Sequence, residues 1–362
     1  MKLSMNISQV IGYASKVSLV VLTIGLATTV PGIKYTLAQK KVNLVGAGAS
    51  FPNPIYSRWF SDMRKDVPDV QVDYQSVGSG AGVRNFTQEL VDFGASDVAM
   101  KDNEIAKVSR GVMMLPMTAG SVVLAYNVPG VSNLKLSREV YVDILLGKIK
   151  KWNDPKIKAI NSGVNLPDLG ITVVYRSDGS GTTGVFTKHL SAISPEWKSK
   201  VGEGKSVQWP VGVGGPKNDG VTAGIKQTKG AIGYIEYSYS RSAGLPTVAL
   251  QNKAGKYVKA SAESTTATLQ AVKLPANLRA FISDPVGDGS YPIVSYTWML
   301  IYGSGYDSAK AVAVEKMIEY GLANAQQKKA ADLGYIPLPG NVRQKVAAAA
   351  DKISSSYKIQ LK

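Results

Sequence analysis

Three glycine- and serine-rich turns constrain the fold of this chain most strongly, because each lies between a strand-like run and a helical pattern. The turns occupy residues 46–50, 78–82 and 177–183. The apolar, β-rich runs before them are residues 42–45, 70–77 and 171–175, and the segments with helical spacing after them are residues 55–65, 83–90 and 184–191. Repeated strand–turn–helix units predict an α/β architecture with a mainly parallel sheet.

Two further β-like segments, residues 112–125 and 292–302, predict the points where the chain crosses between two domains. We expect each domain to contain a central mixed sheet flanked by helices, with a ligand cleft between the domains. Domain I then comprises residues 39–120 and 296–362, and domain II comprises residues 121–295. Other expected elements are a strand at 93–97, a helix at 138–146, a basic turn at 147–154, a strand at 230–237, and helices at 309–322 and 340–352. The polar segment 251–290 gives only weak signals.

The N-terminal segment, residues 1–38, has the pattern of a signal peptide. Lysines precede an apolar run at residues 17–30, which is shorter than the roughly 20 residues that span a membrane. Small residues at 36–38 fit a cleavage site. The pattern predicts a periplasmic protein, with a retained anchor or cleavage nearer Ala27 as alternatives.

The composition excludes several classes of site. The chain has no cysteine and a single histidine, His189, so disulfides, a thiol nucleophile and Cys- or His-rich metal sites are excluded. The formal net charge of +16 favours an anionic partner, although a generally basic proteome would produce the same excess. No dense Lys/Arg run or basic stripe with interleaved aromatics occurs in the sequence, so nucleic-acid binding is disfavoured.

The three turns together predict a site for a tetrahedral oxyanion. In an open α/β sheet, such turns meet outside the carboxyl ends of the strands. Helix N-termini there offer free N–H groups and a partial positive charge, and Ser and Thr add hydroxyl donors. Arg176 precedes the third turn and has the planar fork that matches two oxyanion oxygens. Asp178 then either caps the helix or holds Arg176 by pairing.

Asp97 follows the predicted strand at 93–97 and suggests which oxyanion is bound. A carboxylate only accepts hydrogen bonds, so it attracts an anion that carries a proton and repels one that does not. Phosphate keeps a proton at neutral pH and sulfate does not. A site that depends on one such contact can discriminate by about 10⁴- to 10⁵-fold. Several charge-assisted hydrogen bonds of roughly 1.5–3 kcal/mol each account for micromolar binding without any metal or cofactor.

The motifs, taken in order, resemble those of the periplasmic phosphate-binding proteins of phosphate-specific ABC transporters. They are GAGASFPNPIY (46–56), YQSVGSGAGV (74–83), VDFGASD (91–97), LGKIKKWND (146–154), RSDGSGTTGVFT (176–187) and GAIGYIEY (230–237). The resemblance implies the two-domain type II periplasmic binding protein fold. It implies phosphate ligands at Ser50, Phe51, Ser79, Asp97, Arg176, Ser180, Gly181 and Thr182. The family often has Thr at Ser50 and a second Ser at Gly80, and segment 251–290 departs most.

The resemblance further implies a monomer that delivers phosphate to the membrane permease of an ABC transporter. Other functions remain open. A secreted hydrolase would need Ser180 or Thr182 as nucleophile, with His189 as the only imidazole base, but no Gly-x-Ser-x-Gly motif surrounds these residues. Arsenate is another candidate ligand, because it is protonated and nearly isosteric with phosphate, whereas Asp97 argues against sulfate and molybdate. A protein that only binds other proteins is the third alternative.

Overall fold

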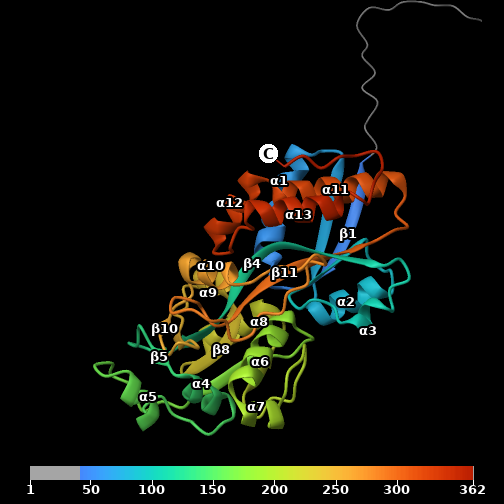
Figure 1. Ribbon diagram of the computed structural model, residues 1–362. Coiled ribbons are helices and arrows are strands. Elements are labelled where there is room, and N and C mark those ends of the chain that lie inside the picture. Colours follow the sequence, from blue (N-terminus) through green and yellow to red (C-terminus); the bar gives the residue numbers. More distant parts are fainter. Residues whose placement is uncertain (1–40, 362) are drawn as a thin grey trace, which may run out of the picture. The chain divides into compact units, whose positions relative to one another are not determined.

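The computed structural model describes residues 41–361, and one mixed eight-stranded sheet organises them in the order β2-β1-β3-β11-β4-β8-β6-β7 (Figure 1). Its strands are β1 Val42–Gly48, β2 Val70–Ser76, β3 Phe93–Ser96, β4 Val112–Asn127, β6 Thr172–Arg176, β7 Val213–Gly215, β8 Ala231–Glu236 and β11 Val294–Tyr302. A second, three-stranded sheet contains β5 Lys135–Leu136, β9 Ala249–Gln251 and β10 Tyr257–Val258. The predicted signal peptide lies outside the described residues.

The strands form two parallel groups joined by antiparallel pairing. On one side β1 pairs in parallel with β2 and β3, and on the other β6 pairs in parallel with β7 and β8. Between the groups, β11 is antiparallel to both β3 and β4, and β4 is antiparallel to β8. The predicted mixed α/β architecture is therefore confirmed.

The long strand β4 links the two groups, because different parts of it pair with different neighbours. Its first part, Val112–Ser121, pairs with β11, and its second part, Val122–Asn127, pairs with β8. The burial of nearly every residue of β3, β4, β8 and β11 agrees with a sheet covered on both faces. Both predicted crossing segments are thus central strands, while the division into two domains stays a prediction.

Helices cover the two faces of the sheet (Figure 1). The N-terminal helices are α1 Asn53–Asp66, α2 Ser79–Thr87, α3 Asp102–Ile105, α4 Arg138–Leu145 and α5 Pro155–Ile160. They are followed by α6 Gly181–Ile193, α7 Pro195–Lys200, α8 Lys217–Gln227, α9 Tyr237–Ala243 and α10 Ala262–Gln270. The C-terminal helices α11 Ser308–Leu322, α12 Asn324–Leu333 and α13 Gly340–Ala350 lie close to α1.

Aromatic side chains fill the space between helices and sheet on both sides. Tyr56 and Phe60 of α1 pack against Tyr74 and Phe93 of the strands, with ring centroids 5.3–6.4 Å apart. In the other group, Tyr234 of β8 stacks on Phe186 and Trp209 at 4.5 and 5.3 Å. Such large buried surfaces give each strand group a rigid core, on which the turns that follow the strands are held.

Two helices begin earlier than the sequence predicts, and this correction matters for the site. Helix α2 begins at Ser79 and α6 at Gly181, inside stretches that the sequence assigns to turns. Glycine costs a helix only about 1 kcal/mol, so it does not prevent these starts. At Gly82 a side chain is sterically excluded, since an added Cβ would lie 2.4 Å from the Cα of Gly48. The Ser and Thr hydroxyls of these stretches therefore belong to helix N-termini.

The structure also adds elements that the sequence did not predict. Segment 251–290 contains the C-terminal residue of β9, the short strand β10 and helix α10, which a Ser261–Ser264 capping box starts. Helix α12 was not predicted either. Within residues 41–361, none of the helices has both the length and the apolar character needed to cross a bilayer.

Candidate functional site

Ser50 and Phe51 form the turn between β1 and α1, and both are buried. Their carbonyl oxygens accept hydrogen bonds from two tyrosines distant in sequence. Tyr239 of α9 donates its hydroxyl to the Ser50 carbonyl at 2.7 Å, and Tyr335 donates to the Phe51 carbonyl at 2.6 Å. These two hydrogen bonds fix the orientation of the turn. Its backbone N–H groups lie just before α1, and the first turn of a helix offers no carbonyl acceptors to N–H groups at that end.

Ser79 and Asp97 lie together at the ends of β2 and β3. The Ser79 Oγ is 3.4 Å from Asp97 Oδ2 and accepts the Asp97 backbone N–H at 3.4 Å. From strand β11, Thr297 donates its hydroxyl to Asp97 Oδ1 at 2.9 Å, and Ser295 donates to the Asp97 carbonyl at 2.9 Å. These contacts fix the carboxyl group, with Oδ1 occupied by Thr297 and Oδ2 directed toward Ser79.

Burial dominates the titration of Asp97. The carboxyl is 1% exposed, and the loss of water raises its pKa to about 7, although the hydrogen bond from Thr297 and the charge of Arg176 act in the opposite direction. When ionised, the Asp97 carboxylate only accepts hydrogen bonds, so Oδ2 can take one from a protonated group of a bound oxyanion.

Arg176, the last residue of β6, is held by a bidentate pair with Asp178. Its Nε donates to Asp178 Oδ1 at 2.8 Å and its Nη2 to Oδ2 at 2.6 Å, while its Nη1 donates to Thr182 Oγ1 at 3.3 Å. Burial acts to raise the pKa of Asp178, but the hydrogen bonds and charge of Arg176 outweigh it, so the pKa is lower than usual. Of the two roles predicted for Asp178, the geometry shows the pairing with Arg176.

Ser180, Gly181 and Thr182 form the N-terminus of α6. Ser180 is the N-cap, and its Oγ accepts the N–H of Thr183 at 3.0 Å. Gly181 faces the other strand group so closely that an added Cβ would lie 2.4 Å from Ser79 Oγ and 2.5 Å from Asp97 Oδ2. Glycine is therefore required at this position, because it lets the turns that follow β1, β2 and β3 meet the turn that follows β6. These are the two groups of turns that form the site.

The two groups of turns are joined by further direct contacts. The N–H of Gly80 donates to the carbonyl of Gly179 at 2.7 Å, and Lys205 forms an ion pair with Glu104 at 2.8 Å. The structure thus brings all the predicted ligand residues to one buried place, where Arg176 ends β6 of one strand group and Asp97 follows β3 of the other. These residues are Ser50, Phe51, Ser79, Asp97, Arg176, Ser180, Gly181 and Thr182.

Sequence reasoning missed several polar residues that support this site. Asn218, the second residue of α8, donates to both Ser50 Oγ and Thr182 Oγ1. Thr297 binds Asp97, as described above, and Tyr239 and Tyr335 hold the Ser50–Phe51 turn. Of these residues, only Asn218 could have been predicted from the sequence, because a Gly-Gly-Pro turn at 214–216 precedes its helix.

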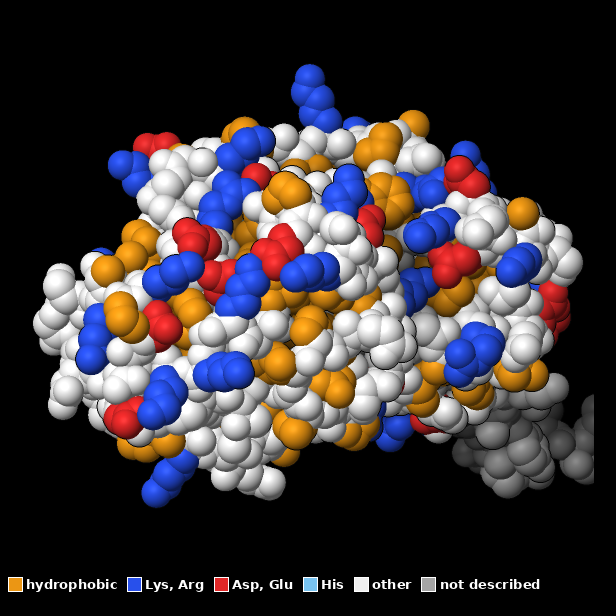
Figure 2. All heavy atoms as spheres, turned by 90° about the horizontal axis from the view of Figure 1, so that it is seen from below, with side chains coloured by type: hydrophobic (Ala, Val, Ile, Leu, Met, Phe, Trp, Pro, Cys, Tyr) orange, Lys and Arg blue, Asp and Glu red, His pale blue; other side chains and the backbone are white. Residues whose placement is uncertain are grey.

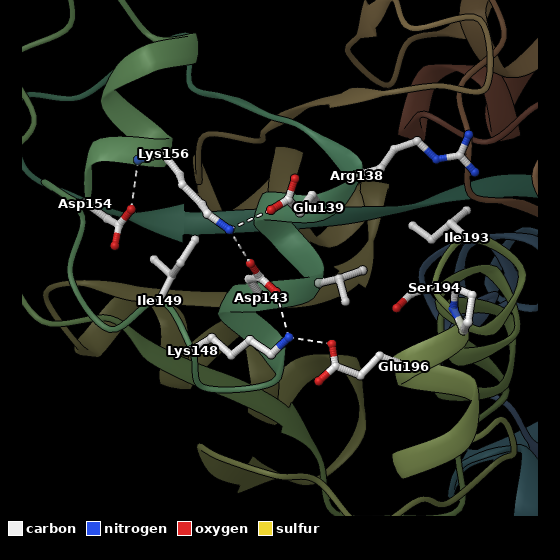
Figure 3. Close-up of a pocket in the computed structure, with 12 residues that line it drawn as sticks. Arg138, Glu139, Asp143, Lys148, Ile149, Asp154, Lys156, Ile193, Ser194 and Glu196 are labelled. Carbon is white, nitrogen blue, oxygen red and sulfur yellow. Dashed lines mark hydrogen bonds and ion pairs between the residues drawn. The ribbon is translucent and has the colours of Figure 1, made fainter.

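A surface pocket of about 860 Å³ lies beside the predicted basic turn, and two lysines there pair with carboxylates that line the pocket (Figure 3). Lys156 contacts Glu139 at 2.6 Å and Asp143 at 3.0 Å, and Lys148 bridges Asp143 and Glu196. The hydrogen bond to Glu196 raises the pKa of Lys148. Lys148 of the LGKIKKWND motif therefore belongs to a surface ion-pair network, and none of the predicted ligand residues lines this pocket.

Positive charge is also dispersed on the face shown in Figure 2, where Lys and Arg side chains alternate with Asp and Glu. A basic patch of the kind that follows a nucleic-acid backbone is not visible on that face. The guanidinium of Arg176, by contrast, is buried, and its side chain is 1% exposed.

Comparison with known proteins agrees with this fold. Residues 34–317 match the family model described as "PBP superfamily domain", which defines the class of solute-binding proteins with the predicted type II fold. The chain is 42% identical over 319 residues to the phosphate-binding protein PstS of Pasteurella multocida, covering 87% of this chain and 91% of that protein. It is 40% identical over 319 residues to the PstS of Methanocaldococcus jannaschii, covering 82% of each.

The chain belongs to the PstS family of phosphate-binding proteins. Among solved structures, the phosphate-binding protein of Stenotrophomonas maltophilia has a TM-score of 0.66 at 21% identity and covers 85% of this chain and 93% of that one. At this identity the likeness concerns the fold, and it confirms the predicted arrangement of a mixed sheet with flanking helices.

Proposed function

We propose that this protein binds inorganic phosphate at the buried site and delivers it to the membrane permease of an ABC transporter. The observation that carries the proposal is the placement of Asp97 and Arg176 in one site lined by hydroxyls and helix N-termini. Arg176 and the helix N-termini stabilise a tetrahedral anion. Asp97 accepts the proton that phosphate carries, and this contact distinguishes phosphate from sulfate. The family names and the phosphate-bound relatives support the same ligand.

The ligand enters when two domains separate. In this proposal residues 39–120 and 296–362 form one domain and residues 121–295 the other, and the hinge lies where β4 passes from β11 to β8. The contacts between Gly80 and Gly179 and between Lys205 and Glu104 then form only on closure. Small-angle scattering should show a smaller radius of gyration with phosphate than without it. An identical radius in both states would contradict domain closure.

The test of the ligand is a phosphate titration by calorimetry, joined to thermal unfolding. Phosphate at 100 times its dissociation constant should stabilise the protein by about 2.7 kcal/mol, and sulfate at the same concentration should not. Arsenate, which is also protonated, should bind. Absence of heat and of stabilisation with phosphate would overturn the proposal.

Transport requires that the chain be exported and act with a permease, and we propose a cleaved signal peptide and a periplasmic monomer. Mass spectrometry of the exported protein should find a new N-terminus near residue 39.

The hydrolase alternative lacks structural support, because His189 lies against Tyr141 with its Nε2 2.8 Å from the tyrosine hydroxyl. Burial lowers the pKa of His189 to about 3. Turnover of a chromogenic phosphate ester that Ser180→Ala abolishes would revive that alternative.

A further inference from the structure

Asn218 lies at the start of α8, at the junction of the two groups of turns, and is fully buried. Its backbone N–H and its side-chain Nδ2 both donate to Ser50 Oγ, at 3.1 and 3.0 Å. The same Nδ2 donates to Thr182 Oγ1 at 3.3 Å. One amide therefore contacts two hydroxyls that come from opposite sides of the site.

The orientation of this amide is fixed by the protein. Its Oδ1 accepts the backbone N–H of Glu236, the last residue of β8, at 3.0 Å. A backbone N–H can only donate, so the oxygen must face Glu236 and the NH₂ group must face Ser50 and Thr182. The helix is secured as well, because the N–H of Lys217 donates to Asp178 Oδ1 at 2.9 Å.

This orientation determines how the two hydroxyls can bond. A hydroxyl has one hydrogen to donate and two lone pairs to accept with. The Ser50 oxygen accepts twice from Asn218, and the Thr182 oxygen accepts once from Asn218 and once from Arg176 Nη1 at 3.3 Å. With both lone pairs occupied, each hydroxyl has only its hydrogen left to offer a ligand.

We propose that Asn218 is a specificity-determining positioning residue that makes Ser50 and Thr182 obligatory hydrogen-bond donors. The inference rests on the proposed phosphate site and extends it. Asp97 is the acceptor of that site, and Asn218 ensures that these two neutral hydroxyls cannot become acceptors too. The proton of the phosphate is then accommodated at Asp97, while oxygens without a proton face Ser50 and Thr182. A ligand that presents a hydrogen-bond donor to these hydroxyls is excluded.

The test is a double-mutant cycle read by phosphate calorimetry. Asn218→Ala should weaken phosphate binding by about 10- to 100-fold, since it frees both hydroxyls to rotate. In a Ser50→Ala or Thr182→Val background, where one of those hydroxyls is already absent, the same change should cost at least threefold less. A residue that only stabilises the fold would give the same loss in every background, and that additivity would overturn the proposal.

A second variant keeps the proposal testable if Asn218→Ala folds poorly. Asn218→Asp has nearly the same shape and still accepts from Glu236 N, but its carboxylate has no hydrogen to donate. The hydroxyls of Ser50 and Thr182 should then turn toward it, and phosphate affinity should fall at least 100-fold. Affinity within threefold of the wild-type value would contradict the proposed role.

The matched control is Asn161→Ala, which removes another buried asparagine whose side chain, among the described residues, bonds to the backbone of Lys135 and Ile157. It should lower the unfolding temperature while phosphate affinity stays unchanged. The wild-type titration separates the two hypotheses. If wild type fails to bind phosphate, the proposed function is wrong. If wild type binds and both Asn218 variants bind equally well, only the role of Asn218 is wrong.

Discussion

Gly181 and Asp97 approach each other so closely that a Cβ on Gly181 would lie 2.5 Å from Asp97 Oδ2. One residue begins helix α6 and the other follows strand β3, so this contact joins the two parallel strand groups. The phosphate site proposed for this protein exists only while the two meet. In this proposal, ligand binding therefore depends on the close packing of Gly181 against Asp97.

Gly181→Ala should abolish tight phosphate binding without unfolding the protein. Alanine is favourable at the start of a helix, so α6 should form, but its methyl group would overlap Ser79 Oγ at 2.4 Å and force the turns apart. Calorimetry should show at least a 100-fold loss. Gly170→Ala is the control, because an added Cβ there meets nothing within 4 Å. Normal binding by Gly181→Ala would show that the site closes differently.

Asp97→Asn should weaken the discrimination between phosphate and sulfate. The amide NH₂ can donate where the carboxylate could only accept, so an oxyanion without a proton becomes acceptable. We expect phosphate affinity to fall at least tenfold and sulfate binding to become measurable by calorimetry.

The matched control for this prediction is Ser295→Ala, which removes the 2.9 Å hydrogen bond to the Asp97 backbone carbonyl and leaves the carboxyl and its bond from Thr297 in place. This variant should still reject sulfate. Unchanged selectivity in Asp97→Asn would exclude the carboxyl as the proton acceptor.

Arg176→Ala should remove most of the phosphate affinity. The guanidinium is the buried positive charge of the site, and its loss also leaves Asp178 without its bidentate partner. Truncating one member of a buried charge pair costs about 2–5 kcal/mol, which corresponds to a loss of roughly 30- to 5,000-fold.

Arg176→Lys keeps the charge but not the planar fork and should give an intermediate affinity by calorimetry. Arg58→Ala, at an exposed arginine paired with Asp62, should leave binding unchanged. Wild-type affinity in Arg176→Ala would remove the guanidinium from the ligand contacts.

The sequence identifies those parts of the site that depend on local pattern. A Gly-Ser turn after an apolar strand is visible in a few residues, so the sequence predicts the turns that contain Ser50, Ser79 and Ser180, while the family resemblance implies these residues as ligands. Thr297 reaches Asp97 only because β11 pairs antiparallel with β3, which aligns Trp298 with Ser96. No local pattern records such a pairing, so Thr297 could not be found.

Asn218 was missed for a different reason. The strand before it, β7, is only Val213–Gly215, too short to give an alternating pattern. Without a recognisable strand, the Gly-Gly-Pro turn was not seen as the fourth of its kind. The predicted starts of α2 and α6 were wrong for another reason. In a sequence, glycines that permit close packing resemble glycines that form turns.

The buried carboxyl of Glu236 should make the phosphate-free protein less stable as the pH rises. Burial raises its pKa from an ordinary 4.5 to about 8, and the charge of nearby Asp97 acts in the same direction. Between these two values the folded protein keeps a proton that the unfolded chain has released. The free energy of unfolding therefore falls as the pH rises through this range. Asp97, with a pKa raised to about 7 by burial, contributes with the same sign.

Thermal unfolding at pH 5.5 and 8.5 tests this dependence. Glu236→Gln cannot ionise, so the loss of stability between the two pH values should be smaller than in wild type. The substitution itself has a cost, since Gln buries an amide where Glu236 Oε1 has no partner among the described residues, but that cost does not change with pH. Glu263→Gln is the control, because its backbone N–H and Ser261 lower the pKa of this exposed carboxyl and keep it ionised at both pH values. Equal losses in wild type and Glu236→Gln would mean that Glu236 is already ionised at pH 5.5.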